Sequence, residues 1–205
     1  CGNTVRRGLR RVKVHGTLQG PYNQGDGGNG AAMRVGPLGG YFAEDAIEVV
    51  VEQARLSSEV THAHADGIAG GVAVAVACAL AWRDHNSDSP LGQAWIVETL
   101  RHVPEGGTRE GIEAALALPP EAGFSEAARV LGNGSRVSSR DTVPYCLWVA
   151  ARAESFEEGM WTTVAALGDR DTTCAIVGSI LALKFGRQAI PAAWLDAREP
   201  LPIEL

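Results

Sequence analysis

The fold is decided by residues 67–82, GIAGGVAVAVACALAW, a run of 16 residues with no charged side chain. A helix that spans a membrane needs about 20 apolar residues, and this run is shorter and rich in alanine and glycine. Small side chains let the backbones of neighbouring helices approach one another closely. We therefore expect residues 66–83 to form the central, tightly packed helix of the protein, and we predict no contact with a membrane.

Helical periodicity dominates the rest of the sequence, and no segment alternates apolar and polar residues for long. The predicted helices cover residues 4–12, 44–56, 66–83, 90–102, 109–117, 125–131, 142–153, 156–167, 171–185 and 191–198. Thr108 and Ser155 precede first-turn acids and are expected to cap the helices that follow them. Helices of this length joined by short turns predict an all-α fold, a compact orthogonal helical bundle, with residues 1–205 in a single domain.

Composition narrows the classes of function. The chain has 205 residues, of which 45% are hydrophobic and 20% charged, and its net charge of −6 gives no support for binding nucleic acid. Its four cysteines are Cys1, Cys78, Cys146 and Cys174, and no two of them form a CxxC pair. The last three lie in apolar helical runs, so we expect buried thiols and a reducing, cytoplasmic setting.

The run LGDRDTT at residues 167–173 places Asp169 and Asp171 two residues apart, where a loop turns into an apolar helix. Carboxylate and hydroxyl oxygens are the ligands that Mg²⁺ or Mn²⁺ prefers. A simpler interpretation is that Asp169 caps the helix and Asp171 is a first-turn acid favoured by the helix dipole. An Asp-x-Asp phosphohydrolase is disfavoured, since it needs a strand before the acids and residues 156–167 have a helical pattern.

Two glycine-rich segments, GDGGNGAAMR at residues 25–34 and LGNG at residues 131–134, also stand out. Asn-Gly tolerates a positive φ, and flanking glycines expose backbone N–H groups that can bind phosphate or ribose oxygens. No predicted strand precedes the first segment, so a Rossmann site is not indicated. A plain loop of tight turns is the alternative interpretation.

The segment SSEVTHAHAD at residues 57–66 contains His62 and His64. Two histidines at this spacing diverge on a helix, and no CxxC or HExxH pattern supports a zinc site. Helix capping with structural hydrogen bonds is one interpretation of this segment, and contact with a ligand is the other.

In their order and separation, these motifs resemble those of the ADP-ribosylglycohydrolase family. The matching motifs are GNGAAMR at residues 28–34, S-x-x-TH at 58–62, GNG at 132–134, VP at 143–144 and GD-x-DT at 168–172. The resemblance runs from about residue 20 to the C-terminus. Five motifs in this order are far more specific than any one of them.

The resemblance implies an all-α fold around a binuclear site for two Mg²⁺ or Mn²⁺ ions. It also implies a hydrolase that cleaves the glycosidic bond at C1″ of ADP-ribose, in ADP-ribosylated proteins or in small ADP-ribose conjugates. By this match the metal ligands would be Asp169, Asp171 and Thr172. The residues that contact ADP-ribose would be Gly28, Asn29, Gly30, His62, Leu131, Gly132, Asn133 and Gly134.

One part of the family pattern has no counterpart in this sequence, namely the N-terminal glutamate and the Thr-Asp-Asp motif that supply the other half of the metal site. We therefore expect the chain to hold only the C-terminal two-thirds of the family domain, with the catalytic residues upstream of Cys1. On this interpretation the isolated chain is inactive. A non-catalytic ADP-ribose-binding protein or a crystallin-like structural relative is the alternative function.

Overall fold

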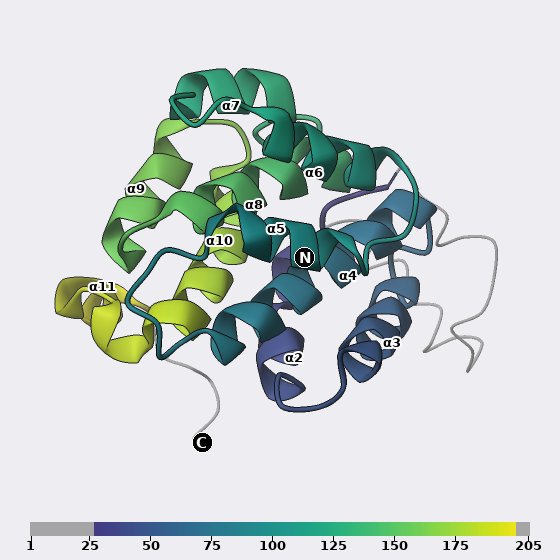
Figure 1. The fold of residues 1–205 in the computed structure, drawn as a ribbon, viewed down its shortest axis with the longest axis horizontal. Coiled ribbons are helices and arrows are strands. Elements are labelled where there is room, and N and C mark those ends of the chain that lie inside the picture. Colours follow the sequence, from purple (N-terminus) through teal and green to yellow (C-terminus); the bar gives the residue numbers. More distant parts are fainter. Residues whose placement is uncertain (1–26, 200–205) are drawn as a thin grey trace.

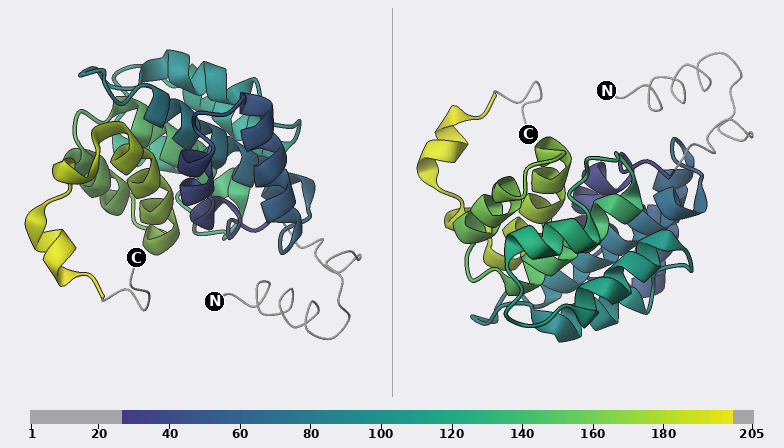
Figure 2. Two further views of the ribbon diagram at one scale, coloured as in Figure 1. Left: turned by 90° about the horizontal axis from the view of Figure 1, so that it is seen from below. Right: turned by 90° about the horizontal axis from the view of Figure 1, so that it is seen from above.

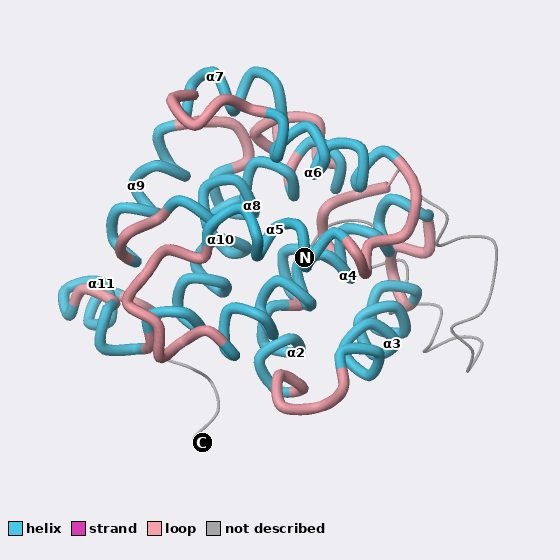
Figure 3. The backbone as a smooth tube through the Cα atoms, viewed as in Figure 1, coloured by secondary structure: helices cyan, strands magenta, loops and turns pink. Residues whose placement is uncertain are grey.

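The computed structural model describes residues 27–199, and every named element in this range is a helix (Figure 1). The α-helices are α2 (Gly36–Tyr41), α3 (Ile47–Glu59), α4 (Ala65–Arg83), α5 (Gly92–Leu100), α6 (Gly107–Ala117), α7 (Phe124–Leu131), α8 (Val143–Arg152), α9 (Phe156–Ala165), α10 (Arg170–Phe185) and α11 (Ala192–Ala197). Three short 3₁₀ helices are η2 (Ala32–Arg34), η3 (Ser139–Asp141) and η4 (Arg187–Ala189). Figure 3 shows these helices joined by loops, so the all-α prediction is confirmed for the described part of the chain.

Helix α4 forms the centre of the bundle, with α2, α3 and α10 packed against it (Figure 2). Its small residues allow this packing, because a Cβ atom on Gly70 or Gly71 would collide with the side chains of Ser139 and Ser58. Among the described helices, α4 alone is long and apolar enough to cross a membrane. However, 72% of its most apolar 18-residue stretch is buried inside the protein. A buried core helix passes the same test, and burial of this extent agrees with the prediction of a central helix.

Helix α2 is an α-helix that the sequence analysis missed, since no predicted helix covers residues 36–41, which contain three glycines. Pro37 stands in its first turn, where the missing N–H group costs nothing. Gly36 and Gly39 bring the helix against its neighbours, since a Cβ atom at either position would collide with Ser179 of α10 or with the Ala75 carbonyl of α4. Close packing therefore outweighs the poor helix propensity of glycine here.

The two predicted helix caps have different outcomes. Ser155 caps α9 as expected, since its hydroxyl accepts a hydrogen bond from the Glu158 amide at 3.1 Å. The prediction for Thr108 is wrong, because α6 begins at Gly107 and Thr108 lies inside it. The carboxylate of Asp66, in α4, accepts from the Thr108 amide at 2.9 Å. This hydrogen bond caps one of the backbone N–H groups at the start of α6. An acceptor from another helix could not be foreseen from the local sequence.

The remaining predicted helices form with shifted ends, and the helix predicted at residues 4–12 lies outside the described residues. The cysteines of the described part are free thiols. Cys78 and Cys146 are buried as expected, whereas Cys174 is only partly buried. Burial raises the pKa of the Cys78 thiol to about 12, so this thiol is unreactive at neutral pH.

Candidate functional site

The run at residues 167–173, called the acidic loop below, joins α9 to the first turn of α10. Leu167 and Gly168 in this loop both have a positive φ. Asp169 occupies the N-cap position of α10, but its side chain makes no capping hydrogen bond. Its carboxylate accepts instead from the side-chain amide of Asn29 at 2.9 Å, across a sequence separation of 140 residues. Helix capping alone therefore does not account for this side chain, because it also reaches Asn29, while Asp171 lies in the first turn of α10.

The environment of Asp169 favours its charged form. Partial burial raises the pKa of this carboxyl, but interactions with Asp171, with Asn29 and with the polar groups of Thr172 together hold the pKa below its usual value. Thr172 is itself buried, with 4% of its surface exposed. Two neighbouring carboxyl groups and a hydroxyl are the oxygen donors that suit Mg²⁺ or Mn²⁺.

These donors supply only part of a coordination shell. Among residues 27–199 no group of three or more histidine, cysteine, aspartate or glutamate side chains could hold a metal ion. The chemistry of the acidic loop therefore fits a divalent cation, and a complete shell needs further ligands.

The first glycine-rich segment lies directly beside the acidic loop. Gly28 forms an isolated antiparallel bridge with Ser138, and the Asn29 amide donates to the Val137 carbonyl at 3.3 Å. The side-chain amide of Asn29, which is 3% exposed, also donates to the Thr142 hydroxyl at 3.1 Å. Asn29 thus holds Asp169 in place from the interior, and Thr142 is a supporting residue that the motif analysis missed.

His62 packs against the same glycine-rich segment, and 7% of its surface is exposed. Its Nδ1 atom lies 2.7 Å from the hydroxyl of Thr61, which also accepts a hydrogen bond from Arg34 at 3.1 Å. His64 occupies the N-cap position of α4, where its Nδ1 accepts from the Asp66 amide at 3.1 Å. Both histidines precede α4 instead of lying on a helix, so the expected divergence on a helix does not occur, and the capping interpretation holds for His64.

Gly30 explains the position of the His62 ring. A Cβ atom at Gly30 would lie 2.8 Å from the Cε1 and Nε2 atoms of His62. We expected glycine here because of a positive φ, and that reason is wrong: in the described part of this segment the positive φ belongs to Gly27. Close approach of the imidazole ring is the reason for glycine at position 30.

The second glycine-rich segment contacts the acidic loop from the other side. Leu131 ends α7 and is buried, and Gly132 and Gly134 have φ values of 90° and 85°. The carbonyl of Asn133 accepts from the Asp169 amide at 3.1 Å. A Cβ atom at Gly134 would lie 2.6 Å from the Cβ of Asp169, so only glycine fits this position. Both glycine-rich segments therefore contact Asp169, and His62 packs against the first of them.

Replacing Gly30 by valine is expected to weaken binding of ADP-ribose by about tenfold or more, because the added side chain must displace the buried His62 ring. Calorimetric titration of the full-length protein with ADP-ribose measures this change. Gly123→Ala is the control, since its φ is −80° and a Cβ atom there meets nothing within 4 Å. Unchanged affinity of the Gly30 variant would exclude this contact from the binding site.

Fold and site define an all-α protein in which two glycine-rich segments contact an acidic loop at Asp169, and its sequence matches a known family. The sequence pattern of the ADP-ribosylglycohydrolase family matches residues 1–203. The ADP-ribosyl-(dinitrogen reductase) glycohydrolase of Rhodospirillum rubrum is 32% identical over 200 residues, which cover 95% of this chain and 58% of that protein. The chain belongs to the ADP-ribosylglycohydrolase family.

Two further similarities agree with this assignment. An uncharacterized protein of Archaeoglobus fulgidus is 35% identical over 169 residues, 82% of this chain and 52% of that protein. The solved structure of an ADP-ribosylglycohydrolase-related protein complex superimposes with a TM-score of 0.69 and 27% identity, covering 97% of this chain and 64% of that one.

The extent of these matches corrects one expectation. We expected the chain to hold only the C-terminal two-thirds of the family domain, with the resemblance beginning near residue 20. The family pattern matches from residue 1 to residue 203, so this expectation is not borne out. The chain nevertheless spans about half the length of the curated relatives, 52% and 58%.

Proposed function

We propose that the protein is a metal-dependent hydrolase that cleaves the glycosidic bond at C1″ of ADP-ribose in ADP-ribosylated proteins or small ADP-ribose conjugates. The observation that carries this proposal is the hydrogen bond from Asn29 to Asp169, which joins the first glycine-rich segment to the acidic loop. Family membership supports the enzyme over a crystallin-like or purely binding protein, because the Rhodospirillum rubrum relative is named as a glycohydrolase.

Asp169, Asp171 and Thr172 would hold the cation, Mg²⁺ or Mn²⁺, with further ligands from outside the described residues. When bound, such a cation orients sugar hydroxyls and lowers the pKa of a bound water molecule. Asn29 donates to Asp169, and this hydrogen bond, together with the interaction with Asp171, favours the ionised form of the carboxylate and would fix its position. The remaining polar groups of the two glycine-rich segments and His62 would bind the ADP-ribose half of the substrate.

Hydrolysis by the full-length protein tests this proposal. Peptides that carry ADP-ribosyl-arginine or ADP-ribosyl-serine, together with O-acetyl-ADP-ribose, are incubated with Mg²⁺ or Mn²⁺, and released ADP-ribose is measured. We expect turnover of at least one of these substrates. Removing the metal with EDTA should abolish turnover, and adding it back should restore it. A protein that releases no ADP-ribose from any of them, with either metal, would contradict the proposal.

A further inference from the structure

The side-chain amide nitrogen of Asn29 donates two hydrogen bonds, and both lie inside the protein. One goes to the Asp169 carboxylate at 2.9 Å and the other to the Thr142 hydroxyl at 3.1 Å. Because Asn29 is 3% exposed, an N–H group without an acceptor at this place would cost free energy. The acidic loop therefore depends on which end of the amide, nitrogen or oxygen, faces Asp169.

The hydrogen bonds of Thr142 decide the orientation of this amide. The Thr142 hydroxyl has a single hydrogen, which it donates to the Ser138 carbonyl at 2.8 Å. Its oxygen can therefore only accept from Asn29, and it must face an N–H group. In the reversed orientation the amide oxygen would face the oxygens of both Thr142 and Asp169, with no hydrogen between them. These two contacts between acceptors disfavour the reversed orientation.

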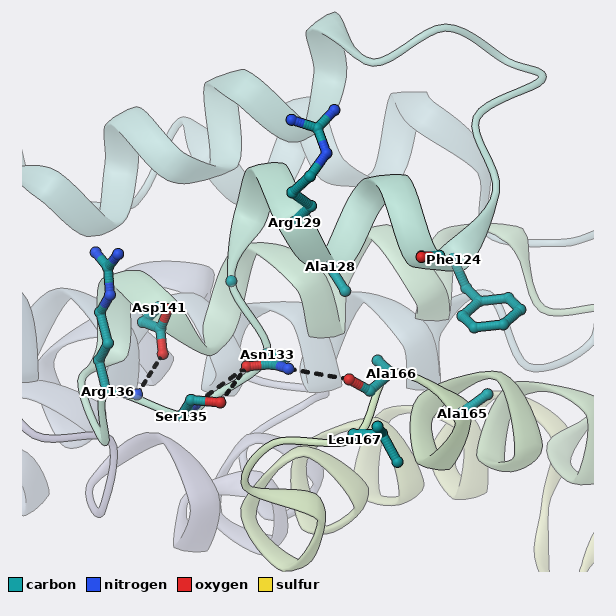
Figure 4. Close-up of a pocket in the computed structure, with 12 residues that line it drawn as sticks. Phe124, Ala128, Arg129, Asn133, Ser135, Arg136, Asp141, Ala165, Ala166 and Leu167 are labelled. Atoms are coloured by element: carbon teal, nitrogen blue, oxygen red, sulfur yellow. Dashed lines mark hydrogen bonds between the residues drawn. The ribbon is translucent and has the colours of Figure 1, made fainter.

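Thr142 is itself held in place by the loop that precedes it. It is fully buried at the N-cap position of α8. The carboxylate of the preceding residue, Asp141, accepts from the Arg136 amide at 2.7 Å. Figure 4 shows this bond beside the one that joins Asn133 to the Ala166 carbonyl at 2.9 Å. The loop is thus closed at both ends, and the Thr142 hydroxyl has a fixed position.

The backbone of Asn29 is fixed independently of its side chain. Its amide donates to the Val137 carbonyl at 3.3 Å, and its carbonyl accepts from the Met33 amide at 3.0 Å. Only the side-chain torsions of Asn29 are left to vary, and the Thr142 hydroxyl restricts them. We therefore expect that removing this hydroxyl changes the direction of the Asn29 amide and leaves the backbone in place.

We propose that Thr142 is a positioning residue for the metal site, which acts through Asn29: it fixes the Asn29 amide so that an N–H group faces the Asp169 carboxylate. This inference rests on the proposed metal-dependent function. A group that hydrogen-bonds to a metal-binding carboxylate orients it, and loss of such a group weakens metal binding by about 10- to 100-fold. The family resemblance implies contact between Asn29 and ADP-ribose, whereas on this proposal the N–H groups of its side chain serve the cation site.

Calorimetric titration of the full-length protein with Mn²⁺ tests the proposal. Thr142→Val keeps the shape of the side chain but removes the acceptor, and it should weaken Mn²⁺ binding by about tenfold. Thr142→Ser keeps the hydroxyl and should bind Mn²⁺ within about threefold of the wild type. Thr99→Val is the matched control and should bind Mn²⁺ like the wild type. Thr99 is also fully buried, and its hydroxyl donates to the Trp95 carbonyl of its own helix at 2.9 Å.

A double variant separates action through Asn29 from a general loss of structure. Asn29→Ala should weaken Mn²⁺ binding about as much as Thr142→Val does. The double variant should bind no more weakly than either single variant, because both changes remove the same contact to Asp169. Losses that multiply to about a hundredfold would show that Thr142 acts independently of Asn29 and would overturn the proposal. Mn²⁺ affinity of Thr142→Val within about twofold of the wild type would overturn it too.

Hydrogen exchange of the Asn29 side-chain amide, measured by NMR without metal, separates this proposal from the proposed function. Exchange in Thr142→Val should be faster by about tenfold or more than in the wild type, because one N–H group loses its acceptor. Thr142→Ser should exchange like the wild type. Equal exchange in the valine variant and the wild type would contradict a fixed amide. Failure to hydrolyse any ADP-ribose conjugate would remove the proposed function, and the exchange rates would still decide the role of Thr142.

Discussion

Replacing Asp171 by asparagine is expected to lower the metal-dependent release of ADP-ribose by about a hundredfold or more, with the fold retained. Asparagine is nearly isosteric and tolerates the first turn of α10, but it loses the charge that a divalent cation requires from its ligand. A bound metal contributes several kcal/mol to the stabilisation of a transition state, and each 1.36 kcal/mol corresponds to tenfold in rate. Initial rates at saturating Mn²⁺ measure the effect.

Asp196→Asn is the matched control, because Asp196 is an exposed aspartate of α11 and forms no ion pair with the described residues. Its rate should stay within about twofold of the wild type, as a change of surface charge alone has a small effect. Thermal unfolding of both variants checks that the fold is intact. A rate for Asp171→Asn within about threefold of the wild type would remove this residue from the metal site.

Replacing Lys184 by methionine is expected to lower the free energy of unfolding by about 3 kcal/mol. Lys184 is 1% exposed, and its Nζ atom donates to the Asp84 carbonyl at 2.8 Å, to the Asp84 carboxylate at 2.6 Å and to the Ser87 carbonyl at 2.7 Å. These bonds tie the end of α10 to the loop that follows α4. Methionine keeps the apolar stem but leaves all three acceptors without their donor.

Urea denaturation monitored by circular dichroism measures this loss. Arg101→Met is the control, since the Arg101 side chain is 67% exposed and its pair with Glu98 lies at the surface. The control should cost less than about 0.5 kcal/mol, the usual range for an exposed ion pair. If both variants unfolded at the same urea concentration as the wild type, the buried lysine would have no stabilising role.

The sequence predicted the central helix because a helix buried on all sides contains a long run of residues without charge. The uncharged run at residues 67–82 lies within α4, and Ser155 caps α9 through a bond to a residue three positions away. Both features depend on residues close together in the chain. The cap of α6 by Asp66 and the helix of residues 36–41 depend on packing between helices, and a local pattern contains no information about such contacts.

The candidate site was predictable as a set of motifs but not as an arrangement. Asn29 was expected to contact a ligand, and in the structure its side chain reaches inward to Asp169 and Thr142. Gly30 was expected to need a positive φ, whereas the His62 ring is what excludes a side chain there. Bonds across 100 residues or more are set by the tertiary fold, so spacing along the chain could not predict them.

The central claim is that the carboxyl groups of Asp169 and Asp171 bind a divalent cation in the full-length protein. Crystals of that protein grown with Mn²⁺, measured at the manganese absorption edge, test it most directly. The account predicts an anomalous peak within coordination distance of both carboxylates, and its loss in Asp171→Asn crystals. A well-ordered acidic loop with no anomalous peak beside either side chain would contradict it.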